Sequence, residues 1–237
     1  MFNEKKIWVL LIAASMPILA SAQFDKLHIN AGTVLSSGKL FSGRESGGLS
    51  APSSRTERLR SSPGLMARLM AGHQVSERLS VAIGLSYESS PYQYHLENFI
   101  LPSDIPRGTS TSFKQDIAVT RVGIPLQLTY QLGETKRLAG IAGLSLERAF
   151  SRKDEAIVTG AGAEDPAILN LNAVDIEGFN VFFSMGMDIV FLDLGSSKLA
   201  LLPAISIGLL GDQVSFTEPR KANLYRAAIF LSYTHQL

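Results

Sequence analysis

Apolar and polar residues alternate one by one along most of this chain, and this period of two constrains the fold more than any other feature. Residues 79–88 place Leu, Val, Ile, Leu and Tyr at every second position, with Ser, Ala, Gly, Ser and Glu between them. Residues 121–131 repeat the pattern. Strict alternation of this kind predicts strands with one apolar and one polar face. We expect eight strands, at residues 27–34, 65–75, 79–88, 121–131, 138–148, 179–192, 199–210 and 224–235.

The composition of the two strand faces predicts which of them points inward. One face holds Leu, Ile, Val, Phe, Met and Tyr, whereas the other holds Gly, Ala, Ser, Asn, Gln, Thr and charged residues, with too little bulk for a hydrophobic core. A soluble barrel buries its large apolar residues, but a barrel in lipid turns them outward and closes its sheet so that every backbone group is paired. The sequence therefore predicts an all-β fold, an eight-stranded antiparallel up-and-down transmembrane β-barrel. A two-sheet sandwich is the alternative.

The connections between the predicted strands alternate in length. Short connections are expected at residues 76–78, 133–136 and 195–198, and longer ones at residues 35–64, 89–116, 149–178 and 211–223. A transmembrane barrel has short periplasmic turns and long extracellular loops. Loops of this length would be unusual inside a compact soluble domain. The loop pattern therefore favours the membrane barrel.

The N-terminus predicts export from the cytoplasm. Lys5 and Lys6 precede an apolar segment at residues 7–19, and Ala20-Ser21-Ala22 offers the small residues of a cleavage site. This is the pattern of a secretory signal peptide, at residues 1–22. The barrel domain would then comprise residues 23–237, in the bacterial outer membrane. No later segment has 18 consecutive apolar residues, so we expect no transmembrane helix.

Charge and residue usage exclude several functional classes. The 237 residues carry a formal net charge of +1, which gives no field that would favour nucleic acid. The chain has no cysteine, so it has no disulfide, thiolate metal site or cysteine nucleophile. The four histidines lack metal-ligand spacing, and neither HExxH nor GxSxG occurs. We therefore expect a non-enzymatic protein without catalytic residues, metal or cofactor.

Two sets of residues follow from the strand phases. Placing the polar face inward brings charged side chains into the bore, where unpaired charges would be costly. We expect a lumen charge network made of Arg68, Glu88, Arg121, Glu147, Asp188 and Arg226. Tyrosines at the strand ends of the apolar face predict an aromatic girdle at the two membrane interfaces, since a phenol is stable with one end wet and the other in hydrocarbon. Its members are Tyr87, Tyr130, Tyr225 and Tyr233.

Several segments resemble a known family. Residues 64–87, the Val-Gly-Ile-Pro-Leu run at residues 122–126 and the Leu-Ala-Gly-Ile-Ala-Gly run at residues 138–143 are similar to the outer-membrane β-barrel proteins widespread in Bacteroidota. That family is related in architecture to OmpA/OmpX- and OmpW-type barrels. The resemblance covers essentially the whole chain after the signal peptide and rests on scaffold motifs. Such barrels often end in Phe, whereas this chain ends in Leu237.

The expected role is that of a porin-like outer-membrane barrel with a structural, surface-interaction or limited small-solute permeation function. The alternatives are an OmpW-like carrier of small hydrophobic molecules with a lateral exit, and a soluble periplasmic β-barrel. Expected partners are outer-membrane lipid, the barrel-assembly machinery during insertion and lipopolysaccharide, but no nucleic acid. The lipopolysaccharide contact would come from the basic first loop, since Arg binds phosphate well. We expect a monomer.

Overall fold

The computed structural model describes residues 24–40, 56–99, 111–134, 137–160, 167–168, 175–215 and 219–237. The predicted signal peptide and much of the first long loop lie outside these residues. Within the described part, no helix has the length and apolar character needed to cross a membrane.

Eleven antiparallel β-strands make up the described fold. Their bounds are β1 Lys26–Leu40, β2 Thr56–Ser61, β3 Gly64–Gln74, β4 Leu79–Phe99, β5 Thr111–Leu132, β6 Leu138–Gly160, β7 Ala167–Ile168, β8 Asp175–Asp193, β9 Ser197–Gly208, β10 Asp212–Ser215 and β11 Pro219–Gln236.

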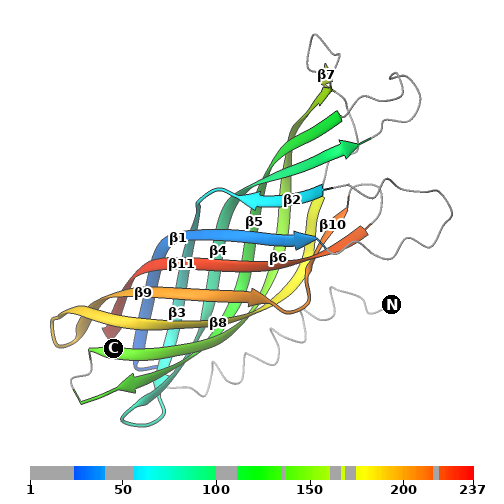
Figure 1. Cartoon of the computed structure of the whole chain (residues 1–237). Coiled ribbons are helices and arrows are strands. Elements are labelled where there is room, and N and C mark those ends of the chain that lie inside the picture. Colours follow the sequence, from blue (N-terminus) through cyan, green and yellow to red (C-terminus); the bar gives the residue numbers. More distant parts are fainter. Residues whose placement is uncertain are drawn as a thin grey trace, which may run out of the picture.

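The sheet closes on itself into a barrel (Figure 1). Strand β1 pairs with β3 on one side and with β11 on the other. Two positions in the wall are each shared by two strands that follow one another. Strand β2 takes the place of β3 beside β4, and β10 takes the place of β9 between β8 and β11. The wall therefore consists of eight antiparallel positions. The predicted eight-stranded up-and-down barrel is confirmed.

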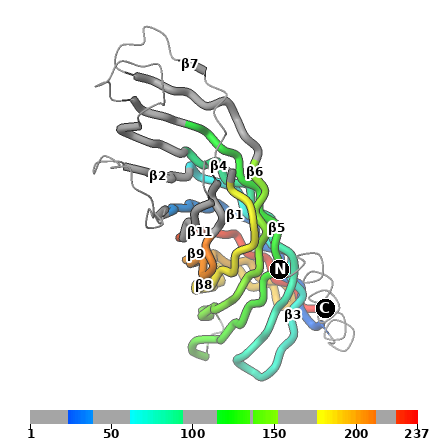
Figure 2. The backbone as a smooth tube through the Cα atoms, turned by 90° about the vertical axis from the view of Figure 1, so that its right-hand side faces the viewer, coloured from blue at the N-terminus to red at the C-terminus, as the bar shows by residue number. Residues whose placement is uncertain are grey.

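The two ends of the barrel differ. At one end, which we call the turn end, short connections join β3 to β4, β5 to β6 and β8 to β9, and both Lys26 and Gln236 lie there. The other end is the loop end. Strands β4, β5 and β6, whose coloured parts run side by side in Figure 2, are the longest of the sheet, with 21, 22 and 23 residues in all. The predicted loop at residues 89–116 therefore starts too early. Backbone pairing between β4 and β5 continues through this segment although its outer face is no longer uniformly apolar.

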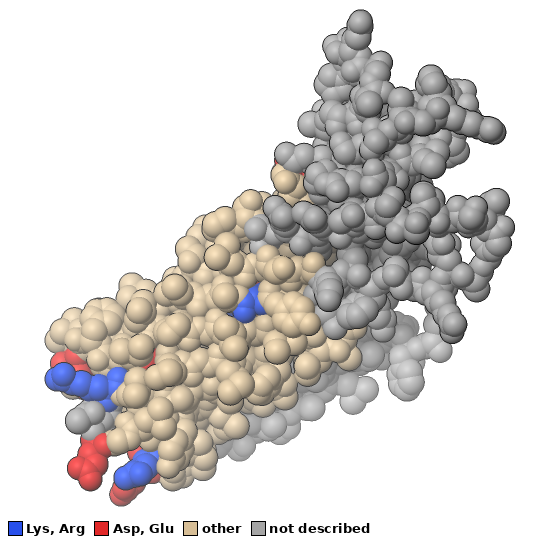
Figure 3. Space-filling model, in the orientation of Figure 1, with Lys and Arg blue, Asp and Glu red and all other residues tan. Residues whose placement is uncertain are grey.

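The apolar strand face points outward. Leu126 is 45% exposed and Ile229 is 56% exposed, on strands far apart in the wall. Between the turn end, where charged residues gather, and the part drawn in grey, the visible side of the barrel is almost free of charge (Figure 3). This orientation is the one predicted, and it excludes the sandwich, whose apolar faces would meet in a dry centre.

The interior contains more apolar bulk than the sequence pattern predicts. Large buried side chains face inward at about mid-height of the barrel, and we call them the apolar layer: Val34, Met66, Met70, Ile141, Phe182, Leu202 and Phe230. Five of them, Val34, Met66, Ile141, Leu202 and Phe230, belong to one packed cluster. The expectation that the inward face is too small for a core is therefore wrong at this height. The error arises where strands carry large apolar residues on both faces, as at Phe182 and Phe183, so that the amino-acid type no longer reports the direction of the side chain.

Candidate functional site

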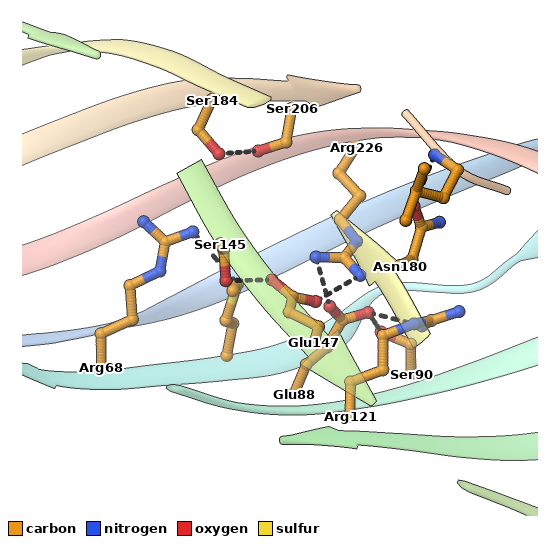
Figure 4. A network of polar contacts seen from close by, with 12 residues as sticks. Arg68, Glu88, Ser90, Arg121, Ser145, Glu147, Asn180, Ser184, Ser206 and Arg226 are labelled. Carbon is orange, nitrogen blue, oxygen red and sulfur yellow. Dashed lines mark hydrogen bonds and ion pairs between the residues drawn. The ribbon is translucent and has the colours of Figure 1, made fainter. Parts of the chain in front are cut away.

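A group of buried ion pairs crosses the bore toward the loop end (Figure 4). Arg226, on β11, lies opposite β4 and β6 in the wall. Its Nη1 is 3.1 Å from Glu88 Oε2, and its Nη2 is 2.7 Å from Glu147 Oε2. Both contacts are ion pairs between the guanidinium group and a buried carboxylate. One arginine thus links the two carboxylates across the barrel.

Arg121 completes this group, which we call the ionic layer (Glu88, Arg121, Glu147 and Arg226). Arg121 and Glu88 are directly paired neighbours on β5 and β4. Arg121 Nη1 donates to Glu88 Oε1 at 3.2 Å and to the hydroxyl oxygen of Tyr92 at 3.0 Å. The Arg121 guanidinium also lies 5.3 Å from the centre of the Tyr92 ring.

Serine hydroxyl groups also donate to the Oε1 atom of each carboxylate. Ser90 Oγ donates to Glu88 Oε1 at 2.8 Å, and Ser145 Oγ donates to Glu147 Oε1 at 2.9 Å. Each serine precedes or follows its glutamate by two residues on the same strand, so the alternation places both side chains in the bore. The ring of Phe182 covers Arg226, with the guanidinium carbon 3.5 Å from the ring centre. Charged groups this far from water are stable only when paired in this way.

Arg68 lies beside the ionic layer but outside its ion pairs. It is 8% exposed, its Nη2 is 3.8 Å from Met66 Sδ, and its guanidinium carbon lies 4.9 Å from the centre of the Phe230 ring. No carboxylate of the described residues lies within ion-pair distance of it, and its Nε has no acceptor.

Asp188 is separated from the ionic layer. It lines a polar cavity of about 650 Å³ at the turn end, which we call the vestibule, together with His28, Lys198 and the turn residues Glu77 and Glu134. Along β11, Thr234 of the vestibule, Phe230 of the apolar layer and Arg226 of the ionic layer face inward in that order. The bore is thus hollow and polar at the turn end, apolar in the middle and ionic beyond.

The four predicted girdle tyrosines all lie on the outer face. Tyr87, Tyr130 and Tyr225 are each about half exposed. Tyr233 is less exposed, and its hydroxyl lies 3.1 Å from Ser197 Oγ. By register, Tyr87 and Tyr225 lie toward the loop end, and Tyr130 and Tyr233 toward the turn end. Two levels of tyrosine therefore flank the apolar outer surface.

The histidines are scattered. His28 Nδ1 lies 2.9 Å from Thr234 Oγ1, His73 Nδ1 lies 3.6 Å from Asp25 Oδ2, and His235 Nδ1 lies 2.9 Å from Ser197 Oγ. The side chain of His95 lies outside the described residues. In the described part of the chain, no three His, Asp or Glu side chains come together in a way that would hold a metal ion.

Tyr92 is the member of the site that sequence reasoning missed. The predicted loop boundary placed it outside the barrel, but it belongs to β4 and is 2% exposed. A usable signal was present, because Glu88, Ser90 and Tyr92 continue the inward phase of the strand at every second position. The interruption at Pro91, which lies on the outer face, concealed it.

Comparisons with known proteins give similarities of fold only. A scan against protein-family models finds no match, and no curated protein sequence matches the chain. Among solved structures, the outer membrane protein OprG from Pseudomonas aeruginosa is 13% identical, with a TM-score of 0.46 over 90% of this chain and 96% of its own.

Two further structures are similar over most of their length. The outer membrane protein AlkL is 16% identical, with a TM-score of 0.38 over 92% of this chain and 94% of its own. The outer membrane protease OmpT from Escherichia coli is 5% identical, with a TM-score of 0.40 over 92% of this chain and 98% of its own. At such low identity, no family or activity is carried over to this chain. The resemblance to the Bacteroidota family stays a prediction.

Proposed function

We propose that this chain is a non-enzymatic outer-membrane β-barrel whose bore is closed by the ionic and apolar layers. The observation that carries the proposal is the contact of Arg226 with both Glu88 and Glu147, which spans the bore. An eight-stranded barrel has an interior that side chains can fill. A filled bore favours a structural or surface-presenting role, with the loop end at the cell surface, over free diffusion of solutes.

The outer surface supports membrane insertion. Many Leu, Ile, Val, Phe and Met side chains are exposed on the outer surface, and a monomeric soluble protein rarely exposes so much apolar surface. Cell fractionation and heat-dependent gel mobility test this part. We expect the protein in the outer-membrane fraction and a mobility shift on boiling, whereas a protein found only in the soluble periplasm would overturn it.

Conductance in planar bilayers tests the closed bore. We expect little or no conductance from the wild-type barrel, and larger openings from the pair Arg226→Ala and Glu147→Ala, which removes the link across the bore. Large stable conductance of the wild type would instead support a pore. The matched control is Arg78→Ala, at an exposed residue of a short turn.

We further propose that the expected partners act at opposite ends of the molecule. The outward phase of β11, from Tyr225 to Tyr233, ends near Leu237 and would be presented to the assembly machinery. Lipopolysaccharide would contact the basic residues of the first loop, whose side chains lie outside the described residues. Crosslinking from Leu231 and binding of purified lipopolysaccharide test these two proposals separately.

A second candidate function, transport of a small hydrophobic molecule with lateral exit, is favoured by one feature of the wall. Strands β8 and β9 pair at Gly186–Ala204 and again at Ile189–Leu201, but not between them. Pro203 lies in this gap, where it has no N–H to donate to the ladder. An apolar groove of about 550 Å³ lies on the outer surface beside it, lined by Met185, Met187, Pro203, Ile205 and Ile229.

Restoring the missing donor tests this candidate. Pro203→Ala is expected to slow uptake of a small alkane-like probe into proteoliposomes if the gap is the exit. The matched control is Pro125→Ala, because Pro125 lies in a similar gap between β4 and β5 without contributing to the groove. Equal uptake by wild type and Pro203→Ala would exclude the lateral exit.

A further inference from the structure

Among the described residues of the bore, buried positive charges outnumber buried negative charges. Three guanidinium groups, of Arg68, Arg121 and Arg226, lie buried with two carboxylates, of Glu88 and Glu147. Glu88 forms ion pairs with Arg121 and Arg226, and Glu147 forms one with Arg226. Among the described residues, Arg68 is therefore a buried cation beside the ionic layer without an ion pair of its own.

The surroundings of Arg68 do not compensate its charge. Its contacts are a thioether sulfur and the face of a phenyl ring. A cation–π contact stabilises a guanidinium by much less than the cost of removing an ion from water. Figure 4 shows Arg68 with its guanidinium apart from the carboxylates, with no ion pair joining it to either.

A second unpartnered group lies directly across from Arg68. Asn30, on β1, is the paired neighbour of Arg68 on β3, and both side chains face the bore. Asn30 is 1% exposed, and among the described residues its Oδ1 has no donor and Arg68 Nε has no acceptor. Buried polar groups are almost always satisfied, so the Arg68 Nε–H points to a further acceptor at this place. Rotation of the Asn30 amide would turn its NH₂ group, a double donor, toward the same place.

We propose that Arg68 and Asn30 bind one small inorganic anion, of the size and charge of chloride, inside the barrel. The anion would accept from Arg68 Nε–H and from the Asn30 amide, and it would neutralise the charge of Arg68. A monovalent inorganic anion suits this place chemically, since one negative charge would balance the one guanidinium that has no carboxylate partner among the described residues. The anion would be a structural component of the closed bore, which goes beyond the function proposed above.

Refolding and urea unfolding in detergent test the site with chloride as the probe. Wild-type protein is unfolded and refolded in sodium chloride and in sodium gluconate of equal ionic strength. A ligand that binds only the folded state stabilises it, so we expect a higher urea midpoint in chloride. Equal midpoints in the two salts would overturn the proposal. This readout is independent of conductance, so it does not depend on whether the bore is open.

Two substitutions locate the effect. Arg68→Met removes the buried cation and suits the apolar neighbours, so its midpoint is expected to be the same in both salts. Asn30→Asp places a carboxylate across from Arg68, so we expect its midpoint in gluconate to rise to at least that of wild type in chloride, with no further gain from chloride. Retention of the chloride effect in both variants would overturn the site.

The control variant is Arg78→Met, which removes an exposed arginine at a short turn and should retain the full chloride effect. Crystals grown in bromide give a direct view of the ion. We expect an anomalous peak within contact distance of Arg68 Nε, and its absence in a wild-type crystal grown in bromide would contradict the proposal.

Discussion

Arg226 on β11 and Glu147 on β6 meet inside the barrel with Arg226 Nη2 2.7 Å from Glu147 Oε2, although β8 and β9 separate their strands in the wall. The contact therefore runs through the interior rather than along the sheet. Since Arg226 also contacts Glu88, a single side chain connects three parts of the wall. The stability of the barrel should depend strongly on it.

Arg226→Ala should destabilise the barrel by about 3–5 kcal/mol, because it leaves two buried carboxylates without their shared counter-charge. The free energy of unfolding in urea, followed by circular dichroism in detergent, measures the loss. Arg78→Ala is the control and should change stability by less than about 0.5 kcal/mol, as expected for an exposed site. A comparable loss in both variants would show that the contact across the bore contributes nothing specific.

Tyr92→Phe should cost about 1–3 kcal/mol. It removes the hydroxyl oxygen that accepts from Arg121 Nη1 at 3.0 Å and leaves a buried charged donor with one acceptor fewer. Tyr87→Phe is the matched control, since Tyr87 faces outward from the same strand and is 49% exposed. Unfolding free energies in the same detergent decide the comparison. If the two variants are equally stable, the Arg121–Tyr92 contact is not part of what holds the bore closed.

Ile229→Arg should impair insertion into lipid. Ile229 lies on the outer face midway between Tyr225 and Tyr233, where a charge facing the bilayer costs about 2–4 kcal/mol. Val75→Arg, at the turn end, should cost about 0–1 kcal/mol because it lies near the interface. The fraction folded in phosphatidylcholine vesicles measures both. A soluble barrel would tolerate both changes, so equal folding of the two variants argues against a membrane location.

Gly84→Ala should destabilise the wall, because an added Cβ would collide with the backbone carbonyl oxygen of Leu69 on the neighbouring strand. Strands that approach this closely can adjust only by moving the backbone, and overpacking of this kind typically costs about 1–3 kcal/mol. Gly140→Ala is the control, since the nearest atom to its added Cβ is Leu132 Cδ1 at 3.9 Å. Heat-dependent gel mobility of the two variants should differ, with Gly84→Ala unfolding at the lower temperature.

The pattern of residues predicts much of this barrel because period-two alternation is a local property of each strand. Residues 121–131 are an example, since every apolar residue that the alternation places on the outer face lies on the outer face. Strand length was predicted less well. Beyond Glu88 and before Arg121 the outer residues are no longer uniformly apolar, so the pattern ends although the backbone pairing of β4 and β5 does not.

The charged residues of the bore could be identified by phase, but their partners could not. The strand phase places Glu88 and Arg121 in one predicted network, and the structure has them in contact at 3.2 Å. The same reasoning put Arg68 in one group with them, whereas its contacts are with Met66 and Phe230. Which arginine reaches which glutamate depends on the diameter and register of the closed barrel, and neither is a property of one strand.

The sequence by itself determined the outward direction of the apolar face and the number of strands, because alternation and turn spacing are encoded residue by residue. The tertiary structure alone decided that the interior is divided into a vestibule, an apolar layer and an ionic layer. It did so because closure brings β11 opposite β4 and β6, so that Arg226 contacts carboxylates more than 75 residues away along the chain.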